Sequence, residues 1–213
     1  MESARNNGDT EEEGLSGTKA RLAEAALETL KAKGFAGATA REIARTGGFN
    51  QALVFYHFGS VQNVLLAALD LVSNRRMRAY QPEFESARTI SELARLARDI
   101  YTDDLANGYV TVLGEMVSGG VSDPRLGREV VARIEPWIGM VERKLRALLI
   151  GSGFESMVPP RDLAFAIIAL YLGIDMLSHL DGDRTRAESL LDLGVRYAPV
   201  VEALLSSPRT EER

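Results

Sequence analysis

The stretch TAREIARTGGFNQALVFYHFGSVQNVLL, residues 39–66, decides the fold. Apolar residues recur at helical spacing on both sides of Gly47 and Gly48, which predicts two short helices over 39–46 and 50–57 joined by a tight turn. Another periodic segment precedes them and a longer one follows. Three short helices followed by a long one are typical of a helix-turn-helix domain, although the spacing alone fits an ordinary helical bundle equally well.

Several residues around this stretch have the chemistry of helix ends. Gly34 stands where the first helix should end. Thr39 and Glu42 have capping-box spacing, so the hydroxyl and the carboxylate are both expected to bind backbone N–H groups. Asn50 and Ser60 are further candidate N-caps, and Asn50 has the alternative of touching a DNA base or phosphate.

The rest of the chain continues the helical period, and no segment alternates convincingly with the period of a strand. The fold class we predict is therefore all-α. The nine helices that we expect have the approximate limits 18–33, 39–46, 50–57, 61–81, 89–106, 108–118, 123–150, 159–180 and 184–205. The polar residues 1–17 and 206–213 lack an apolar period and are expected to be disordered tails.

Composition excludes several classes of function. The chain has 213 residues and no cysteine, which rules out thiol catalysis, disulfides and cysteine-bound zinc, and it has only two histidines. We expect no metal and no cofactor. The longest apolar run, 163–174, is too short to span a bilayer, and the polar, acidic N-terminus is unlike a signal peptide, so we expect no membrane partner and a cytoplasmic location.

Charge is distributed unevenly. The net charge is −5, yet residues 18–60 carry six basic and three acidic side chains, a net +3. A basic segment inside an acidic chain fits a small DNA-binding domain attached to a larger part with another task.

Residues 40–66 resemble, almost position by position, the N-terminal signature of the TetR (tetracycline-repressor) family, and the similarity extends over about 18–70. The resemblance implies a helix-turn-helix DNA-binding domain over 18–65, joined by a long helix to a ligand-binding and dimerisation domain over 66–205. It also implies that the helix 50–57 enters the major groove of double-stranded DNA.

Side-chain chemistry then suggests roles for the DNA-binding residues. Arg41 can bind guanine, Gln51 can bind adenine, and Ala52 offers a small contact to a thymine methyl group. Phosphate contacts, which set register rather than read sequence, suit Lys19, Thr39, Tyr56 and His57, and Phe55 completes the predicted DNA-binding set. For His57 the alternative is packing within the domain.

The sequence departs from the family pattern at two places. Relatives usually have tyrosine where this chain has Phe55, so a phenolic hydroxyl that binds phosphate is missing there, and Tyr56 could replace it. Relatives usually have Ser-Lys-Glu at the start of the fourth helix, where this chain has Ser60, Val61 and Gln62, which removes a basic group. Both departures predict weaker phosphate binding or a narrower choice of operator.

The resemblance further implies that the last two helices pair with their counterparts in a homodimer. A helical apolar stripe on the segment 184–205 fits that interface; its members are Leu190, Leu193, Tyr197, Val200 and Leu204. The segment 159–180 is apolar on every side over much of its length, as expected of a helix that faces both the partner and a ligand pocket. The alternative is a large monomeric core.

Within the family the C-terminal helices enclose an apolar pocket for a small effector. The pocket candidates in this chain are Tyr101, Met116, Trp137, Met140, Tyr171, Asp175, Met176 and His179. Methionine and aromatic side chains line adaptable pockets, but at helical spacing they equally form plain core. Asp175 and His179 lie one helical turn apart and either orient a ligand or hydrogen-bond to each other.

Together these features predict a dimeric, ligand-responsive transcriptional regulator. A repressor that binds a pseudo-palindromic operator and is released by a small, largely hydrophobic effector is the leading interpretation. The alternatives are an enzyme that uses Asp175 and His179 as an acid–base pair, for which neither a nucleophile nor a metal set is present, and a helical binding module without DNA activity.

Overall fold

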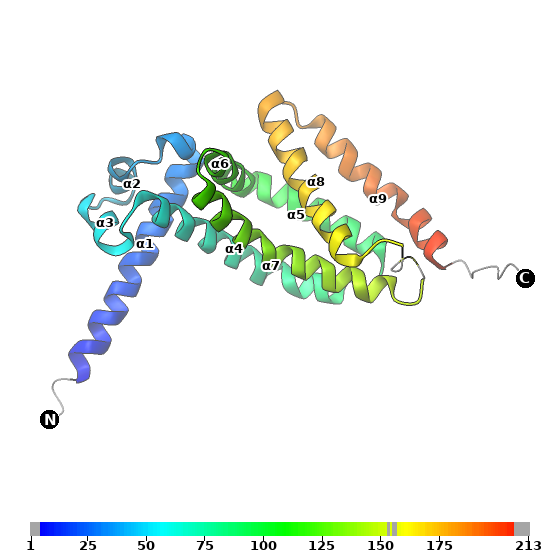
Figure 1. The fold of residues 1–213 in the computed structure, drawn as a ribbon, viewed down its shortest axis with the longest axis horizontal. Helices are drawn as coiled ribbons and strands as arrows, with labels where there is room; N and C mark the ends of the chain where they lie inside the picture. The colour runs from blue at the N-terminus through cyan, green and yellow to red at the C-terminus, as the bar shows by residue number, and fades with distance from the viewer. Residues whose placement is uncertain (1–4, 153, 155–156, 207–213) are drawn as a thin grey trace, which may run out of the picture. The chain divides into compact units, whose positions relative to one another are not determined.

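The computed structural model describes residues 5–152, 154 and 157–206, with the side chains of 5–16, 179, 181 and 206 outside that description. Within these residues the chain is all-α, as predicted, and no strand is present (Figure 1). The helices are α1 (Arg5–Gly37), α2 (Ala40–Gly47), α3 (Ala52–Phe58), α4 (Val61–Ser86), α5 (Ile90–Asn107), α6 (Tyr109–Ser122), α7 (Pro124–Leu149), α8 (Pro160–Asp181) and α9 (Thr185–Ser206).

The chain divides into two compact units. Unit 1 comprises Met1–Asn74 and Thr111–Val130, and unit 2 comprises Arg75–Val110 and Val131–Arg213. We predict from the sequence a single boundary after residue 65, and the structure differs because most of α6 and the start of α7 belong to unit 1. The boundaries of the units therefore fall inside α4, α6 and α7.

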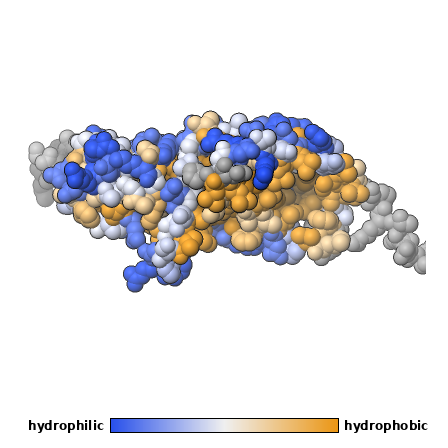
Figure 2. Space-filling view, turned by 90° about the horizontal axis from the view of Figure 1, so that it is seen from above, coloured by the Kyte–Doolittle hydropathy of each residue, from blue (hydrophilic) through white to orange (hydrophobic). Residues whose placement is uncertain are grey.

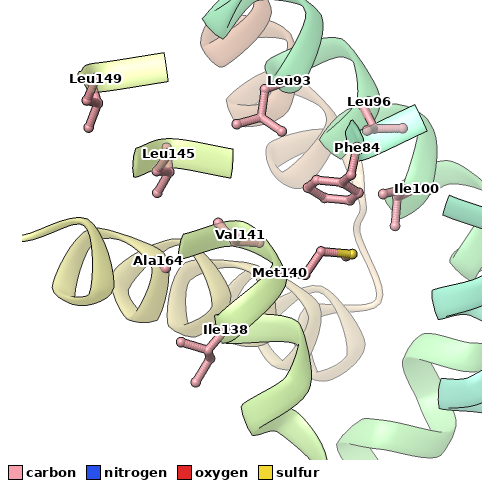
Figure 3. Packing of buried hydrophobic residues seen from close by; sticks show 10 residues of the cluster. All are labelled: Phe84, Leu93, Leu96, Ile100, Ile138, Met140, Val141, Leu145, Leu149 and Ala164. Carbon is pink, nitrogen blue, oxygen red and sulfur yellow. The ribbon is translucent and has the colours of Figure 1, made fainter. Parts of the chain in front are cut away.

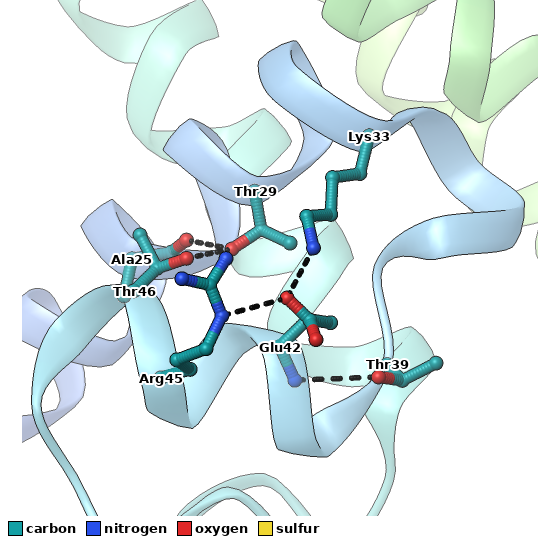
Figure 4. Close-up of polar contacts among 7 residues, drawn as sticks. All are labelled: Ala25, Thr29, Lys33, Thr39, Glu42, Arg45 and Thr46. Carbon is teal, nitrogen blue, oxygen red and sulfur yellow. Dashed lines mark hydrogen bonds and ion pairs between the residues drawn. The ribbon is translucent and has the colours of Figure 1, made fainter.

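Unit 1 is built around the packing of α1 against α2. Leu22, Ala26 and Leu30 follow one another at a spacing of four residues, so they share one face of α1, and all three are fully buried. Thr29 is buried as well, and its hydroxyl lies 2.7 Å from the carbonyl oxygen of Ala25, to which it donates (Figure 4). This bond satisfies the one polar group on a face that is otherwise apolar.

The start of α1 corrects one expectation. Residues 1–17 are predicted to form a disordered tail, but α1 begins at Arg5. Extending an existing helix costs less free energy than nucleating one, so the packed part of α1 can propagate through a polar segment. The predicted tail 206–213 lies outside the described residues except for Ser206, the last residue of α9.

A kink in α1 accommodates α6 within unit 1. Gly34 has φ 67°, and a Cβ atom there would lie 2.7 Å from a carboxylate oxygen of Glu115. The same carboxylate accepts a hydrogen bond of 2.6 Å from the backbone N–H of Phe35. Gly119 approaches the Phe35 ring so closely that an added Cβ would be 2.7 Å from it. Gly34 thus interrupts the helix where predicted, and Glu115 binds a backbone group exposed by the kink.

In unit 2, α9 packs on α5 and also contacts α8. The larger apolar cluster combines residues of α4, α5, α7 and α8 (Figure 3). Its buried members are Phe84, Leu93, Leu96, Ile100, Ile138, Met140, Val141, Leu145, Leu149 and Ala164. A smaller cluster contains Tyr101, Ile174 and Ala187.

The described residues also give findings on metal-binding groups and on membrane-spanning helices. The described residues contain no group of three or more His, Cys, Asp or Glu side chains placed to hold a metal ion. Among the same residues no single helix has the length and apolarity to cross a membrane, and the one pair that meets the criteria jointly, α3 with α4, is bent by 72°.

Candidate functional site

The helix α2 begins at Thr39, whose hydroxyl accepts a 3.3 Å hydrogen bond from the backbone N–H of Glu42. The second half of the predicted capping box is wrong, because the Thr39 N–H donates to the Gly37 carbonyl at 2.9 Å. The Glu42 carboxylate instead pairs with Lys33 and, at 3.0 Å, with Arg45 (Figure 4). Hydrogen bonds from Lys33 and Arg45 hold the pKa of Glu42 below its usual value. Two nearby cations compete better for this carboxylate than a backbone amide does.

The structure explains why residues 47 and 48, at the turn between α2 and α3, are both glycine. Gly48 has φ 68° and ψ 33°, the left-handed conformation that glycine adopts without strain. Gly47 leaves no room for a side chain, because a Cβ atom there would lie 2.1 Å from the Phe49 ring and 2.8 Å from the Cβ of Ala25. The guanidinium of Arg21 stacks on the Phe49 ring, 5.1 Å from its centre. These contacts fix the angle at which α3 leaves α2.

Asn50 has a defined role at the start of α3. Its side-chain oxygen accepts a 2.9 Å hydrogen bond from the backbone N–H of Ala52. Of the two alternatives for Asn50, the structure shows the one that stabilises the helix start. The contact uses one end of the amide only, and a role at DNA remains a prediction.

The helix α3 has one buried and one exposed side. Val54 is completely buried, whereas Phe55 is 51% and Tyr56 is 76% exposed. The half-buried ring of His57 lies edge-on to Tyr56, with 4.9 Å between the ring centres. Large aromatic side chains that are this exposed in a small domain indicate a surface that meets a partner.

The other residues predicted to bind DNA are also in unit 1. Exposed side chains belong to Lys19, Thr39, Arg41, Asn50, Gln51 and Ala52. Arg41 has no ion-pair partner within the described part of the chain, in contrast to Arg45, which pairs with Glu42. The structure thus leaves Arg41 and Gln51 accessible to an external ligand.

The start of α4 explains one departure from the family pattern. Ser60 caps the helix, as predicted, by accepting a 3.2 Å bond from the Asn63 N–H. The Gln62 amide donates to Asp123 at 2.8 Å, and Asp123 also accepts bonds from the backbone N–H groups of Arg125 and Leu126. These bonds, the backbone ones first, lower the pKa of Asp123. A glutamate at position 62 would face this carboxylate and be repelled, so the amide suits the contact.

Unit 2 contains a buried polar cluster, which we define as Arg76, Tyr101, Asp104 and Tyr171. Asp104 is completely buried and forms an ion pair with Arg76. The Tyr171 hydroxyl donates to the same Asp104 oxygen at 2.5 Å. The Tyr101 and Tyr171 rings meet edge-on with 5.8 Å between centres, and the Trp137 ring lies 4.7 Å from the Arg76 guanidinium carbon.

The cluster contains two of the predicted effector residues, Tyr101 and Tyr171, and a third, Trp137, stacks on its Arg76. It also includes Arg76 and Asp104, which the sequence reasoning missed. A signal for Asp104 was available, because it lies four residues after the apolar Ile100 and three after Tyr101, on the same helical face. A carboxylate at such a position is unusual enough to mark a special environment.

The remaining effector candidates are less closely connected with the cluster. Met140 is part of the larger apolar cluster, Asp175 is buried, and Met176 is partly exposed. Met116 is fully buried but belongs to unit 1. His179 lies in α8 with its side chain outside the described residues, so its pairing with Asp175 stays a prediction.

The cluster predicts a pH dependence of stability. Burial raises the pKa of Asp104 to about 6, despite the opposing effect of Arg76. The folded chain therefore holds this proton more tightly than the unfolded chain, in which the pKa is about 3.9. The contribution of Asp104 to stability is greatest below pH 4, should fall by up to about 3 kcal/mol between pH 4 and 6, and should change little above that. Urea unfolding of the wild type and of Asp104→Asn between pH 4 and 7 measures this difference, and parallel curves would contradict it.

The predicted dimer residues form an exposed stripe on α9. Leu190, Leu193, Tyr197, Val200 and Leu204 are between 42% and 71% exposed. The helix α8 adds exposed apolar side chains, among them Phe165, Leu170, Leu177 and Leu180. Figure 2 shows a broad apolar area over this C-terminal part of the chain. A surface of this kind is characteristic of a protein–protein interface.

Comparisons with known proteins agree with this geometry. The family of bacterial regulatory proteins called tetR has a model that matches residues 22–68. No curated protein sequence matches the chain significantly.

Solved structures share the fold over nearly the whole chain. The fatty acid degradation regulator FadR of Bacillus halodurans is similar with 14% identity and a TM-score of 0.70, over 92% of this chain and 97% of its own. FadR of Bacillus subtilis, solved in complex with stearoyl-CoA, has 12% identity and a TM-score of 0.68, over 89% and 99%. A transcriptional regulator of Cytophaga hutchinsonii has 15% identity and a TM-score of 0.68, over 93% and 98%. These similarities establish a common architecture.

Proposed function

Because the chain belongs, through residues 22–68, to the TetR family of bacterial regulatory proteins, we propose that it is a dimeric repressor whose operator binding is released by a small effector. Regulation of transcription in response to a ligand is the common function of such proteins. The observation that carries the proposal is the exposed surface of α2, α3 and the turn between them. Arg41, Gln51 and Tyr56 are exposed on it, whereas Val54 of α3 is buried.

We propose that α3 enters the major groove and that Arg41 and Gln51 bind base edges. Tyr56 is the most exposed aromatic residue of α3 and suits a phosphate contact next to Phe55, which lacks a hydroxyl group. Thr39, the N-cap of α2, and Lys19, an exposed residue within α1, suit further phosphate contacts. Asn50, whose side-chain oxygen accepts a hydrogen bond from the Ala52 N–H, is exposed and suits a contact to DNA as well.

The simplest test is binding of the full chain to random-sequence duplex DNA at several salt concentrations. We expect measurable binding that weakens steeply as salt rises, because phosphate contacts release bound counterions. Absence of binding even at low salt would contradict the DNA-binding role.

Val61→Lys should strengthen this binding. Val61 is the first residue of α4, and a lysine there would restore the basic group that relatives usually carry. We expect tighter binding and a salt dependence steeper by about one phosphate contact. Val61→Gln is the matched control, since it introduces a polar side chain without charge. An unchanged salt dependence of Val61→Lys would show that this helix end does not approach the DNA.

The dimer that we propose forms through the exposed faces of α8 and α9. Both helices bury one side inside unit 2, as Ala164 and Ala198 show, and present leucines on the other. Pairing with a second copy would remove this apolar surface from water. A two-fold dimer also presents two copies of α3 to half-sites about one DNA turn apart, which requires a pseudo-palindromic operator.

The effector site that we propose lies in unit 2, around the buried polar cluster. The apolar residues next to it suit a largely hydrophobic ligand, and a structural neighbour that binds stearoyl-CoA supports a ligand with a long apolar part. Arg76 of the cluster and Val61 at the DNA-binding end both belong to α4. A ligand that binds Arg76 can therefore act on the DNA-binding unit through a continuous helix.

A further inference from the structure

Three polar atoms of the buried polar cluster have no hydrogen-bond partner among the described residues. They are Nε of Arg76, the hydroxyl oxygen of Tyr101 and Oδ1 of Asp104. Tyr101 is 1% exposed and Asp104 is 0% exposed, so solvent at the surface does not reach these side chains. A buried polar group without a partner destabilises the fold, and folded proteins contain few such groups. Three such atoms in one place therefore call for a partner from outside the chain.

The three atoms belong to side chains that contact one another. Arg76 is paired with Asp104, and Tyr171 links the two by donating to Asp104 and lying 3.5 Å from an Arg76 nitrogen. Tyr101 lies one helical turn before Asp104 on α5 and packs edge-on against Tyr171. The existing bonds occupy Oδ2 of Asp104 and one terminal nitrogen of Arg76, which leaves Oδ1 and Nε for a ligand.

Apolar side chains adjoin the cluster on two sides. Tyr101 and Tyr171 belong with Ile174 to the smaller apolar cluster, against which Leu105 also packs. Trp137, whose ring contacts Arg76, packs against the larger cluster. A few polar groups converging within apolar surroundings are the usual composition of a site for a small organic molecule.

The unpartnered atoms define the chemistry of the missing group. Nε of Arg76 can only donate, Oδ1 of an ionised Asp104 can only accept, and the Tyr101 hydroxyl can do both. A carboxylate or phosphate would offer no donor to Asp104 and would be repelled by its charge. An ammonium group would offer no acceptor to Arg76.

We propose that the buried polar cluster binds the polar end of the effector, and that this end is an uncharged group that both donates and accepts hydrogen bonds, such as a hydroxyl or a primary amide. The inference rests on the proposed effector site in unit 2 and adds the chemical class of its ligand. The apolar remainder of the molecule would lie among the surrounding aromatic and aliphatic side chains.

The test compares four probes that share one alkyl chain: decanol, decanamide, decanoate and decylammonium. Calorimetric titration of the full chain gives the Kd of each probe. Decanol and decanamide should bind at least tenfold more tightly than either charged probe. Preferred binding of decanoate or decylammonium, or no binding of any probe, would overturn the proposal.

Two single-residue variants test whether the uncharged probe binds at the buried polar cluster. Tyr101→Phe removes one hydroxyl group from the cluster and should weaken decanamide binding by about three- to tenfold. Tyr80→Phe is the matched control, because the Tyr80 hydroxyl donates to Asp103, which is not part of the cluster. The affinity of this variant for decanamide should equal that of the wild type. Equal effects of the two variants, with both still folded by circular dichroism, would contradict the assignment.

The DNA measurement separates this inference from the proposed function. If decanamide binds as expected but does not weaken DNA binding, the cluster assignment stands and release by an effector at this site is wrong. If the chain binds DNA normally while the uncharged probes do not bind, the DNA-binding role stands and the cluster assignment is wrong.

Discussion

Combining Leu177→Glu with Leu193→Glu should convert the protein into a monomer and weaken its binding to operator DNA by about a hundredfold or more. Leu177 on α8 is 68% exposed and Leu193 on α9 is 45% exposed, so both present much of their apolar surface outward. In a two-fold dimer each substitution introduces carboxylates on both copies, in an apolar interface where charges are costly to desolvate. Loss of the dimer also removes the advantage of binding two half-sites at once.

Analytical ultracentrifugation and DNA titration of the same samples measure both effects. Val121→Glu is the control, because Val121 is 80% exposed but lies on α6 in unit 1. That variant should remain dimeric. A dimer of unchanged stability in the double variant would exclude α8 and α9 as the interface.

Arg41→Ala and Gln51→Ala should each weaken binding to the operator by about ten- to a hundredfold, while leaving binding to random DNA much less affected. Both side chains are exposed on the surface formed by α2 and α3. A bidentate contact to a base contributes about 1–3 kcal/mol of discrimination, which is lost on truncation to alanine.

Arg45→Ala is the matched control for this pair of variants. Arg45 lies on the same helix as Arg41 and is exposed, but its guanidinium pairs with Glu42. Its substitution should reduce operator and random DNA binding to a similar, small extent. If Arg41→Ala and Gln51→Ala both retain full operator preference, sequence reading by these residues is wrong.

Much of the fold could be predicted from local sequence. Helix starts at Thr39 and Ser60 and the turn at Gly48 depend on side-chain or backbone properties of a few adjacent residues, and all three occur as expected. The exposed stripe on α9 was likewise visible as a helical period. In each case the determining interactions lie within a few residues of one another.

Features that depend on distant partners could not be predicted. The place of α6 in unit 1 depends on Glu115 binding the backbone of Phe35, eighty residues earlier in the chain. The Glu42 carboxylate forms an ion pair with Lys33 instead of completing the capping box. Lys33 is on the preceding helix, so only the folded chain places the two side chains together. The ion pair between Arg76 and Asp104 connects α4 with α5, and the sequence around either residue does not predict which residue is its partner.

The structure explains one departure from the family pattern, Gln62, but not the other, Phe55. Gln62 has a specific reason, since its amide binds Asp123 within unit 1. Phe55 remains half exposed, where a hydroxyl would be accessible, and nothing in the structure of the chain alone requires its absence. We therefore expect the reason for Phe55 to lie in the operator.

Selection of bound duplexes from a random DNA pool by the wild-type protein is the most direct test of the central claim that α2 and α3 of a dimer recognise an operator. Sequencing of the selected DNA should show a pseudo-palindrome whose half-sites are centred about one helical turn apart. Enrichment of a single, unrepeated half-site, or no enrichment over the starting pool, would contradict the claim.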